Sequence, residues 1–149
     1  AYSLIDSKII KKNKIYLPNV SRETLSELED YSQSILETNK KINLISSSTE
    51  KSIYTRHIYD SAQTIEFIDK NDISICTDLG SGAGLPGIVL SILMKSKKPL
   101  FKVIFYEKSY HKSNFLKEIS KKFKLNTEIN QKNIFEQKNL QTDIIISRD

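Results

Sequence analysis

The four glycines of this chain all lie in one short segment, Asp78-Leu-Gly-Ser-Gly-Ala-Gly-Leu-Pro-Gly87. Glycine is costly in conformational entropy, so this concentration indicates backbone that turns sharply or passes close to another group. Pro86 lacks a backbone donor and suits the first position of a helix, which predicts a helix from that point. An apolar run precedes the glycines. The segment therefore predicts a strand, a loop and a helix, the place where α/β folds bind ligands.

The chain from residue 71 onward alternates between two periodicities. Short runs rich in Ile, Val, Phe and Thr predict strands, and runs with apolar residues three to four apart predict helices. Such a β-α-β-α-β order is typical of a parallel, doubly wound sheet with right-handed crossovers. We expect strands over residues 73–79, 102–106, 127–129 and 143–147, and helices over residues 86–94 and 110–123.

The first 70 residues have a helical pattern. Residues 21–39 form one amphipathic helix in this interpretation, and residues 1–20 form a short helix or arm. A second helix is expected over residues 47–68, with Ser47 and Glu50 as a capping box at its start. We therefore divide the chain into an N-terminal helical extension, residues 1–70, and a Rossmann-like cofactor-binding domain, residues 71–149.

The composition excludes several classes of protein. With 149 residues, of which 38% are hydrophobic and 28% charged, the chain has the size of one domain. It contains no apolar run near the ~20 residues of a membrane helix and no apolar stretch typical of a signal peptide. Its single cysteine, Cys76, allows no internal disulfide and no Cys-based zinc cluster. We expect a soluble, cytoplasmic protein without a metal.

The net charge of +5 is unevenly distributed. Lysines and arginines balance acidic residues over residues 1–70, whereas residues 95–124 hold ten lysines against Glu107 and Glu118. A field of one sign favours a polyanion such as RNA. Lysines that only solvate helix faces would give the same count, so charge alone leaves both interpretations open.

Two cofactors fit the glycine segment. Gly82 to Gly87 matches the G-x-G-x-x-G pattern, in which a helix N-terminus receives a dinucleotide pyrophosphate. The register Gly80-x-Gly82-x-Gly84, with Asp78 before it, instead suits S-adenosylmethionine, whose sulfonium a carboxylate can face. Glu107 closes the second strand, where a carboxylate can bind ribose hydroxyls of either cofactor. Glu107 could also pair with Lys108 or Lys112 at the surface.

Five motifs follow one another along the chain: Asn43-Leu44 with Glu50, Arg56-His57-Ile58-x-Asp60-Ser61, Asp78 to Ile88, Lys112-x-x-Phe115-Leu116 and Ser147-Arg148. Together they resemble one family, the bacterial 16S (small-subunit) ribosomal RNA guanine-N7 methyltransferases, also called the glucose-inhibited division protein B family. The resemblance implies a class I S-adenosylmethionine-dependent methyltransferase fold that acts on 16S ribosomal RNA or the small ribosomal subunit. A sheet of this class continues after its fourth strand, so we expect an incomplete sheet.

The resemblance also implies roles for single residues. Gly80 and Leu85 belong to the cofactor loop and Glu107 to the ribose end, with Asn133, Ile134 and Arg148 as further cofactor contacts. From the glycine register we add Asp78, Gly82 and Gly84. Arg56, His57 and Lys112 are candidates for contact with RNA. For two of these an ordinary alternative stays open: an Arg56–Asp60 ion pair, and a His57 that only packs between helices.

Guanine N7 carries a lone pair and no proton, so its methylation requires no general base. Catalysis can rest on alignment of the reacting atoms, and we name no catalytic residue. Two alternatives stay open: an NAD-type dinucleotide-binding module, and a non-catalytic RNA-binding fragment.

Overall fold

The computed structural model describes residue 17 and residues 19–80, 82–133 and 140–147, and for residues 54–56 only the backbone. Its centre is a parallel sheet with the strand order β3-β2-β1-β4. The predicted parallel sheet is therefore confirmed, with the fourth strand beside the first, so that the strand order reverses at β1. The strands are β1 (Ile75–Leu79), β2 (Lys102–Tyr106), β3 (Thr127–Asn130) and β4 (Ile144–Ser147).

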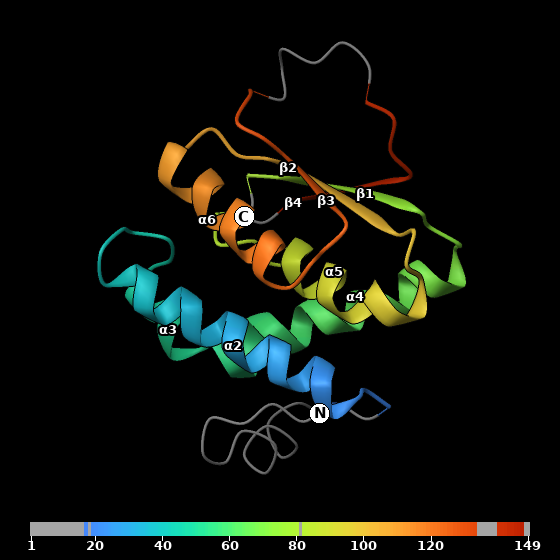
Figure 1. Ribbon diagram of the computed structural model, residues 1–149, viewed down its shortest axis with the longest axis horizontal. Coiled ribbons are helices and arrows are strands. Elements are labelled where there is room, and N and C mark those ends of the chain that lie inside the picture. Colours follow the sequence, from blue (N-terminus) through green and yellow to red (C-terminus); the bar gives the residue numbers. More distant parts are fainter. Residues whose placement is uncertain (1–16, 18, 81, 134–139, 148–149) are drawn as a thin grey trace.

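The described helices all lie on one side of this sheet (Figure 1). Helices α5 (Gly87–Lys97) and α6 (Tyr110–Lys122) pack against its strands, and α4 (Tyr59–Lys70) packs against α5. The alternation of side chains along each strand points Cys76, Val103 and Phe105 toward the helices, where all three are fully buried. On the opposite face Ile145 of β4 stays half exposed.

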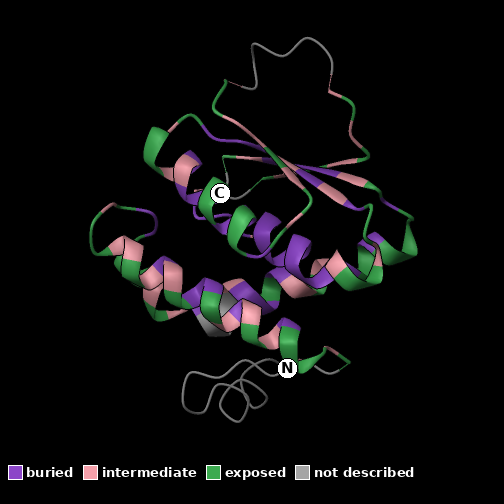
Figure 2. Ribbon diagram, viewed as in Figure 1, coloured by how far each residue is buried: buried purple, intermediate pink, exposed green. Residues whose placement is uncertain are grey.

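Helix α5 lies in the middle of the protein. Every residue from Gly87 to Met94 is buried, as Figure 2 shows along this helix, because α5 packs against the sheet on one side and against α2 and α4 on the other. A helix that is apolar around its whole circumference is expected to have such a position. The predicted helix over residues 110–123 is also confirmed as α6, and its apolar residues Phe115, Leu116, Ile119 and Phe123 are buried.

The N-terminal part of the described chain begins with α2 (Arg22–Asn39), close to the predicted range. Ser21 caps it, since the Ser21 hydroxyl accepts a hydrogen bond of 3.1 Å from the Thr24 amide. Leu28, Tyr31 and Ile35, spaced three to four residues apart, are fully buried. This face of α2 packs against α5.

The prediction of one helix over residues 47–68 was wrong. The structure has α3 (Ser47–Lys51), a π-helix η2 (Ile53–Ile58) and then α4. The predicted capping box was wrong too, because the cap of α3 is Ser46 and the Glu50 carboxylate binds the Asn39 amide at 2.6 Å. At the junction the Ser52 hydroxyl donates to the Ser48 carbonyl at 3.1 Å, and the Ser52 carbonyl accepts from the His57 amide, five residues on. These bonds favour the wider π-turn.

Two other boundaries differ by a few residues. Strand β1 begins at Ile75 and not at residue 73, because Ile73 is bonded to the end of α4 through the Ile68 carbonyl. Pro86 is the cap of α5, and the first helical residue is Gly87. Neither difference moves the glycine segment from its place between β1 and α5.

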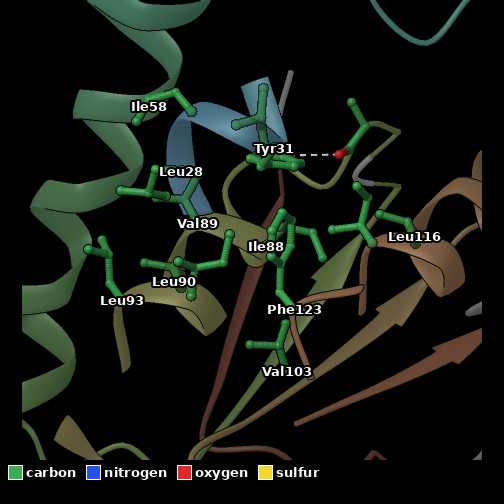
Figure 3. Close-up of a cluster of buried hydrophobic side chains, with 14 of the residues drawn as sticks. Leu28, Tyr31, Ile58, Ile88, Val89, Leu90, Leu93, Val103, Leu116 and Phe123 are labelled. Carbon is green, nitrogen blue, oxygen red and sulfur yellow. Dashed lines mark hydrogen bonds between the residues drawn. The ribbon is translucent and has the colours of Figure 1, made fainter. Parts of the chain in front are cut away.

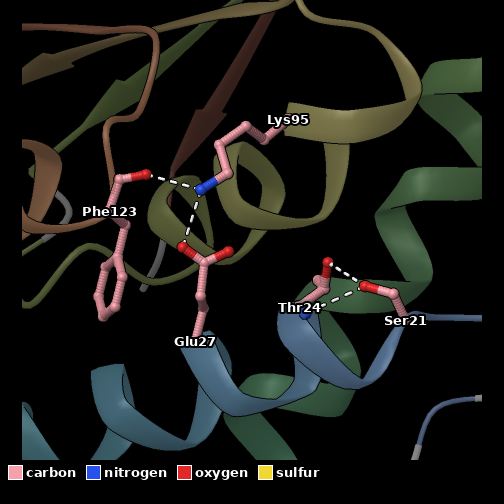
Figure 4. A network of polar contacts seen from close by, with 5 residues as sticks. All are labelled: Ser21, Thr24, Glu27, Lys95 and Phe123. Atoms are coloured by element: carbon pink, nitrogen blue, oxygen red, sulfur yellow. Dashed lines mark hydrogen bonds and ion pairs between the residues drawn. The ribbon is translucent and has the colours of Figure 1, made fainter.

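An ion pair joins three helices away from the glycine segment (Figure 4). The Lys95 ammonium on α5 lies 2.8 Å from the Glu27 carboxylate of α2 and donates to the carbonyl oxygen of Phe123, at the end of α6, at 2.7 Å. These groups are partly exposed, so the ion pair itself adds little stability. Its geometry nevertheless fixes α2 against the two crossover helices.

Candidate cofactor and substrate site

The loop between β1 and α5 lies at the carboxyl end of the sheet, where parallel α/β folds bind ligands. Gly80, Gly82 and Gly84 have φ values of 62°, 59° and 95°. This left-handed region is open to glycine at no steric cost, whereas other residues are strained there. The clustering of glycines in the sequence is thus explained by the backbone path of this loop.

The glycines differ in what surrounds them. A Cβ on Gly84 would lie 2.3 Å from the Ile88 side chain and 2.9 Å from Leu116. A Cβ on Gly80 would meet nothing within 4 Å, and one on Gly82 only the Leu44 carbonyl at 3.6 Å. Gly84 is therefore required for packing, and Gly80 and Gly82 border open space on the side expected to receive a ligand.

Helix α2 contacts this loop through a buried hydrogen bond. The Tyr31 hydroxyl, fully buried, donates a hydrogen bond of 2.7 Å to the Ala83 carbonyl (Figure 3). The periodicity that predicts an amphipathic helix over residues 21–39 counts Tyr31 only as one of its apolar residues. No pattern in the sequence distinguishes a tyrosine with a buried hydrogen bond from one that only fills volume.

Asp78, the residue before the last of β1, points inward. Its carboxylate is fully buried, and Oδ2 accepts a hydrogen bond of 3.0 Å from the Gly87 amide. This amide is one of the donors at the start of α5, so Asp78 places a negative charge at the N-terminus of that helix. Asp78 lies beside the cofactor loop, and its contact with a cofactor stays a prediction.

Glu107 lies at the end of β2, next to the glycine loop, as its sequence position predicts. Its Oε1 accepts a hydrogen bond of 3.1 Å from the Gly82 amide, and Oε2 accepts one of 2.9 Å from the Ser109 amide. The alternative pairing with Lys108 or Lys112 was wrong, since neither lysine forms an ion pair in the described part of the chain. Two segments distant in sequence thus meet here.

A second support for the loop was missed by sequence reasoning. The Asn39 side-chain oxygen accepts hydrogen bonds from the Leu44 amide at 2.8 Å and the Ile45 amide at 2.9 Å. Glu50 in turn accepts from the Asn39 amide group. Because the Leu44 carbonyl lies over Gly82, this network fixes one wall of the site. An asparagine at a helix end, followed by a short loop, was the available signal.

The candidate RNA-contacting residues lie on two sides of the loop. His57 is half-buried in η2, with Nε2 3.3 Å from the Ser52 hydroxyl. Lys112 is half-buried in the first turn of α6, shortly after Glu107. Arg56 lies in η2, and its side chain is outside the described part, so the predicted Arg56–Asp60 pair is untested. The structure does not bring His57 and Lys112 together.

Three predicted cofactor residues follow β3 and β4. Asn133 is half-buried a few residues beyond β3, whereas Ile134 and Arg148 lie outside the described residues. Leu85, in contrast, is buried in the loop itself. Asn133 and Leu85 are both placed near the carboxyl end of the sheet by the elements that precede them.

The described residues contain no cluster of metal-binding side chains, and Cys76 is buried. No three His, Cys, Asp or Glu side chains there are close enough to hold a metal ion. Burial, and to a lesser extent the nearby Asp78 charge, raises the pKa of Cys76 to about 12, so this thiol is protonated and unreactive. None of the described helices is long and apolar enough to span a membrane.

Solved structures share this fold at low sequence identity. The chain matches an O-methyltransferase from Bacillus cereus, solved in complex with SAH, with a TM-score of 0.63 and 15% identity over 99% of this chain and 61% of that one. It also matches the O-methyltransferase TomG from Streptomyces achromogenes, in complex with SAM, with a TM-score of 0.60, 10% identity and coverage of 98% and 60%. The chain has the class I methyltransferase fold.

Sequence relatives are more specific. A protein named ribosomal RNA small subunit methyltransferase G from Pelagibacter ubique is 52% identical over 132 residues, which cover 87% of this chain and 62% of the relative. A protein of the same name from Cereibacter sphaeroides is 38% identical over 130 residues, with the same coverage. This chain thus spans less than two thirds of the length of these relatives. The family model of rRNA small subunit methyltransferase G matches residues 24–149, and the chain belongs to that family.

Proposed function

We propose that this protein transfers a methyl group from S-adenosylmethionine to N7 of a guanine in 16S ribosomal RNA. One observation carries the proposal: in a chain of this family, the glycine loop and Glu107 meet at the carboxyl end of the sheet, with Gly82 N and Glu107 Oε1 3.1 Å apart. Such a substrate also implies a cytoplasmic location, where ribosomal subunits are assembled.

The residues present fit this cofactor. Each Glu107 oxygen accepts one hydrogen bond from a backbone amide and keeps further acceptor capacity, which the two ribose hydroxyls would use. The backbone at Gly80 borders open space, so a ligand can approach it closely. We propose Gly80, Gly82, Gly84 and Leu85 as the loop that holds the cofactor. Asp78 would stabilise its sulfonium end through charge, and Asn133, Ile134 and Arg148 complete the proposed set.

The start of α5 favours S-adenosylmethionine over a dinucleotide. A pyrophosphate in a G-x-G-x-x-G site binds to the free amides of the helix N-terminus. Here the Gly87 amide is occupied by the Asp78 carboxylate, and the Ile88 amide bonds to the Gly84 carbonyl at 2.6 Å. A buried carboxylate at this point would repel a pyrophosphate, whereas it attracts a cationic sulfonium.

Methyl transfer to guanine N7 depends on how the two reactants are positioned, and it requires no general base. S-adenosylmethionine, when bound, supplies an electrophilic methyl group, and guanine N7 has a lone pair without a proton. This chain therefore has to bind both partners, align them and exclude water. Fixed backbone serves that purpose, and the Tyr31 and Asn39 hydrogen bonds rigidify the loop and its wall.

The start of α6 supports RNA as the partner. Lys108 and His111 are exposed there, and Tyr110 is 62% exposed with its ring 5.5 Å from that of His111 in an edge-to-face contact. Neither Lys108 nor Lys112 forms an ion pair within the described residues, so both charges are available to phosphates. We propose this end of α6, together with Arg56 and His57, as the contact with ribosomal RNA.

We also propose that the chain consists of two parts with different roles. Residues 1–70 would form an extension whose α2 buttresses the glycine loop, and residues 71–149 the cofactor-binding domain. The Tyr31–Ala83 and Lys95–Glu27 contacts between the two parts support an extension that acts on the site and does not merely flank it.

The proposal is tested by cofactor binding and methyl transfer. Isothermal calorimetry would compare S-adenosylmethionine with NAD, on the wild type and on Glu107→Gln. We expect binding of S-adenosylmethionine alone, and a loss of about tenfold in Glu107→Gln, because the amide group replaces one acceptor by a donor. Glu118→Gln, an exposed change on α6, is the matched control and should bind as the wild type does.

Transfer is measured with a tritiated methyl donor on 16S RNA and on small ribosomal subunits, with the product analysed for 7-methylguanine. Incorporation at guanine N7 would support the full proposal. Binding of NAD would contradict it in favour of a dinucleotide module, and RNA binding without any affinity for S-adenosylmethionine would favour a non-catalytic RNA-binding protein.

A further inference from the structure

A pocket of about 290 Å³ opens at the carboxyl end of the sheet, beside the glycine loop. Three separate parts of the chain form it. The π-helix η2 and helix α4 contribute one wall, the loop before α5 the second, and the end of β4 the third. Its lining includes His57, Asp60, Thr64, Leu85, Pro86 and Ser147.

The position of this pocket in the strand order separates it from the ribose end of the cofactor site. Glu107 follows β2 on one side of β1, whereas Ser147 ends β4 on the other. The pocket lies on the β4 side, so the glycine loop stands between it and Glu107. A ligand held at Glu107 and the loop would thus have the pocket at its far end. This is also the point where the strand order reverses, and ligands in α/β sheets bind at such a point.

The size and the walls of the pocket suit a single base. Its volume is at the lower end of the range for small-ligand sites, enough for one flat heterocycle and not for a nucleotide pair. The half-buried Pro86, with Leu85 beneath it, supplies apolar surface on which an extruded base can pack. Enzymes that modify a base inside a folded nucleic acid bind it in this way and recognise its Watson–Crick edge.

Asp60 gives the pocket a chemical preference. Its side chain is exposed, and its carboxylate forms no ion pair or hydrogen bond within the described part of the chain. An ionised carboxylate only accepts hydrogen bonds. Guanine presents two adjacent donors on its Watson–Crick edge, N1–H and the 2-amino group, whereas adenine presents an acceptor at N1.

On this basis, which includes the proposed function, we propose that the pocket is the acceptor site and that Asp60 selects guanine. The Asp60 carboxylate accepts hydrogen bonds from guanine N1–H and from the 2-amino group. These groups are on the edge of the base opposite to N7, so N7 is left directed toward the glycine loop and the cofactor. Asp60 is a specificity residue in this arrangement and takes no proton in the reaction.

The test compares RNAs that differ in one atom or group. Short single-stranded oligouridines would carry one central guanine, inosine or 7-deazaguanine, and their binding would be measured with S-adenosylhomocysteine present. We expect the wild type to prefer guanine over inosine by about tenfold, because inosine lacks the 2-amino donor. 7-Deazaguanine should bind as guanine does, since N7 is not the atom that Asp60 contacts.

The variant Asp60→Asn should reduce the preference for guanine over inosine to less than about twofold, because its side-chain amide has a single acceptor oxygen and cannot accept from both N1–H and the 2-amino group. Asp69→Asn, in the last turn of the same helix, is the control and should keep the preference. Asp60 also lies in the first turn of α4, so thermal unfolding of both variants would confirm that each is folded at the assay temperature.

Two results would overturn the proposal: a wild type that binds guanine and inosine RNAs equally, or an Asp60→Asn variant that keeps the full preference. Binding of S-adenosylhomocysteine alone is measured for each protein. Normal affinity for it would confine such a failure to the base-recognition role of Asp60. Its absence in the wild type would overturn the proposed function itself, and this inference with it.

Discussion

The Tyr31 hydroxyl and the Ala83 carbonyl, 52 residues apart in the chain, form a buried hydrogen bond of 2.7 Å. Tyr31 belongs to α2 in the helical extension, and Ala83 belongs to the glycine loop. The bond therefore joins the extension to the backbone that the cofactor is proposed to contact. An extension that only covered apolar surface would not need this polar contact.

Replacement Tyr31→Phe removes that bond and leaves the Ala83 carbonyl buried without its donor. We expect a loss of about 1 to 3 kcal/mol in the free energy of unfolding. The affinity for S-adenosylmethionine should fall as well, because the loop is less rigid. Urea unfolding and calorimetry measure the two effects, with Tyr110→Phe at an exposed position as the control. Unchanged values in both measurements would show that the bond has no role.

Two glycines of one loop should respond differently to alanine. The Cβ of Gly84→Ala would collide with Ile88 and Leu116, so we expect a loss of about 2 to 4 kcal/mol of stability from overpacking and from the strained φ. Gly80→Ala meets no neighbour and should lose only about 1 to 2 kcal/mol for its φ of 62°. Denaturant unfolding of both variants tests this order, and a Gly84→Ala as stable as Gly80→Ala would contradict it.

Asp143 makes the free energy of unfolding depend on pH in the acidic range. Hydrogen bonds from the Ile75 and Ser74 amides, with a smaller contribution from the Lys98 charge, hold the pKa of Asp143 below its usual value. A lowered pKa gives stability that is present above the unfolded pKa of about 3.9 and is lost as the pH falls through the folded pKa.

Asp143→Asn removes this titration. We therefore expect the stability advantage of the wild type over Asp143→Asn to be constant above about pH 5 and to shrink below about pH 4. Urea unfolding of both proteins, at pH values above and below this range, measures the advantage. An advantage that grows in acid would reverse the predicted sign.

We expect much of the salt dependence of RNA binding to come from Lys108, just before α6, and Lys112, in its first turn. The double variant Lys108→Gln/Lys112→Gln is expected to lower the slope of log K against log salt by about 1.4 to 1.8. Lys121→Gln/Lys122→Gln removes the same charge from the far end of the helix and should change the slope less. Equal effects of both pairs would indicate a diffuse field and no defined contact.

Local patterns in the sequence were sufficient for the fold class and for the position of the cofactor loop. Strands and helices follow from two different periodicities, and the glycines between β1 and α5 have positive φ because no other residue adopts that path freely. Glu107 could be placed at the site from the sequence, since the carboxyl ends of parallel strands share one edge. The start of α2 at Ser21 was equally local.

The sequence pattern failed where tertiary contacts compete with local ones. Ser47 and Glu50 have the spacing of a capping box, but Glu50 binds Asn39 from another helix, and Ser46 takes the cap. The helical periodicity of residues 47–68 conceals the π-helix, because its apolar residues are buried in either geometry. The spacing of residues along the chain cannot reveal which of two equivalent partners a side chain binds.

By itself, then, the amino-acid sequence determined the order of strands and helices, the glycine loop and the carboxylate that faces it, since these depend on residues close in the chain or on the rules of parallel sheets. Only the tertiary structure decided that Asp78 turns inward to the start of α5, that Tyr31 supports Ala83, and that Asp60 and Ser147 line one pocket. Each of these contacts joins segments whose proximity no sequence pattern predicts. The packing of the whole core sets the distance between them.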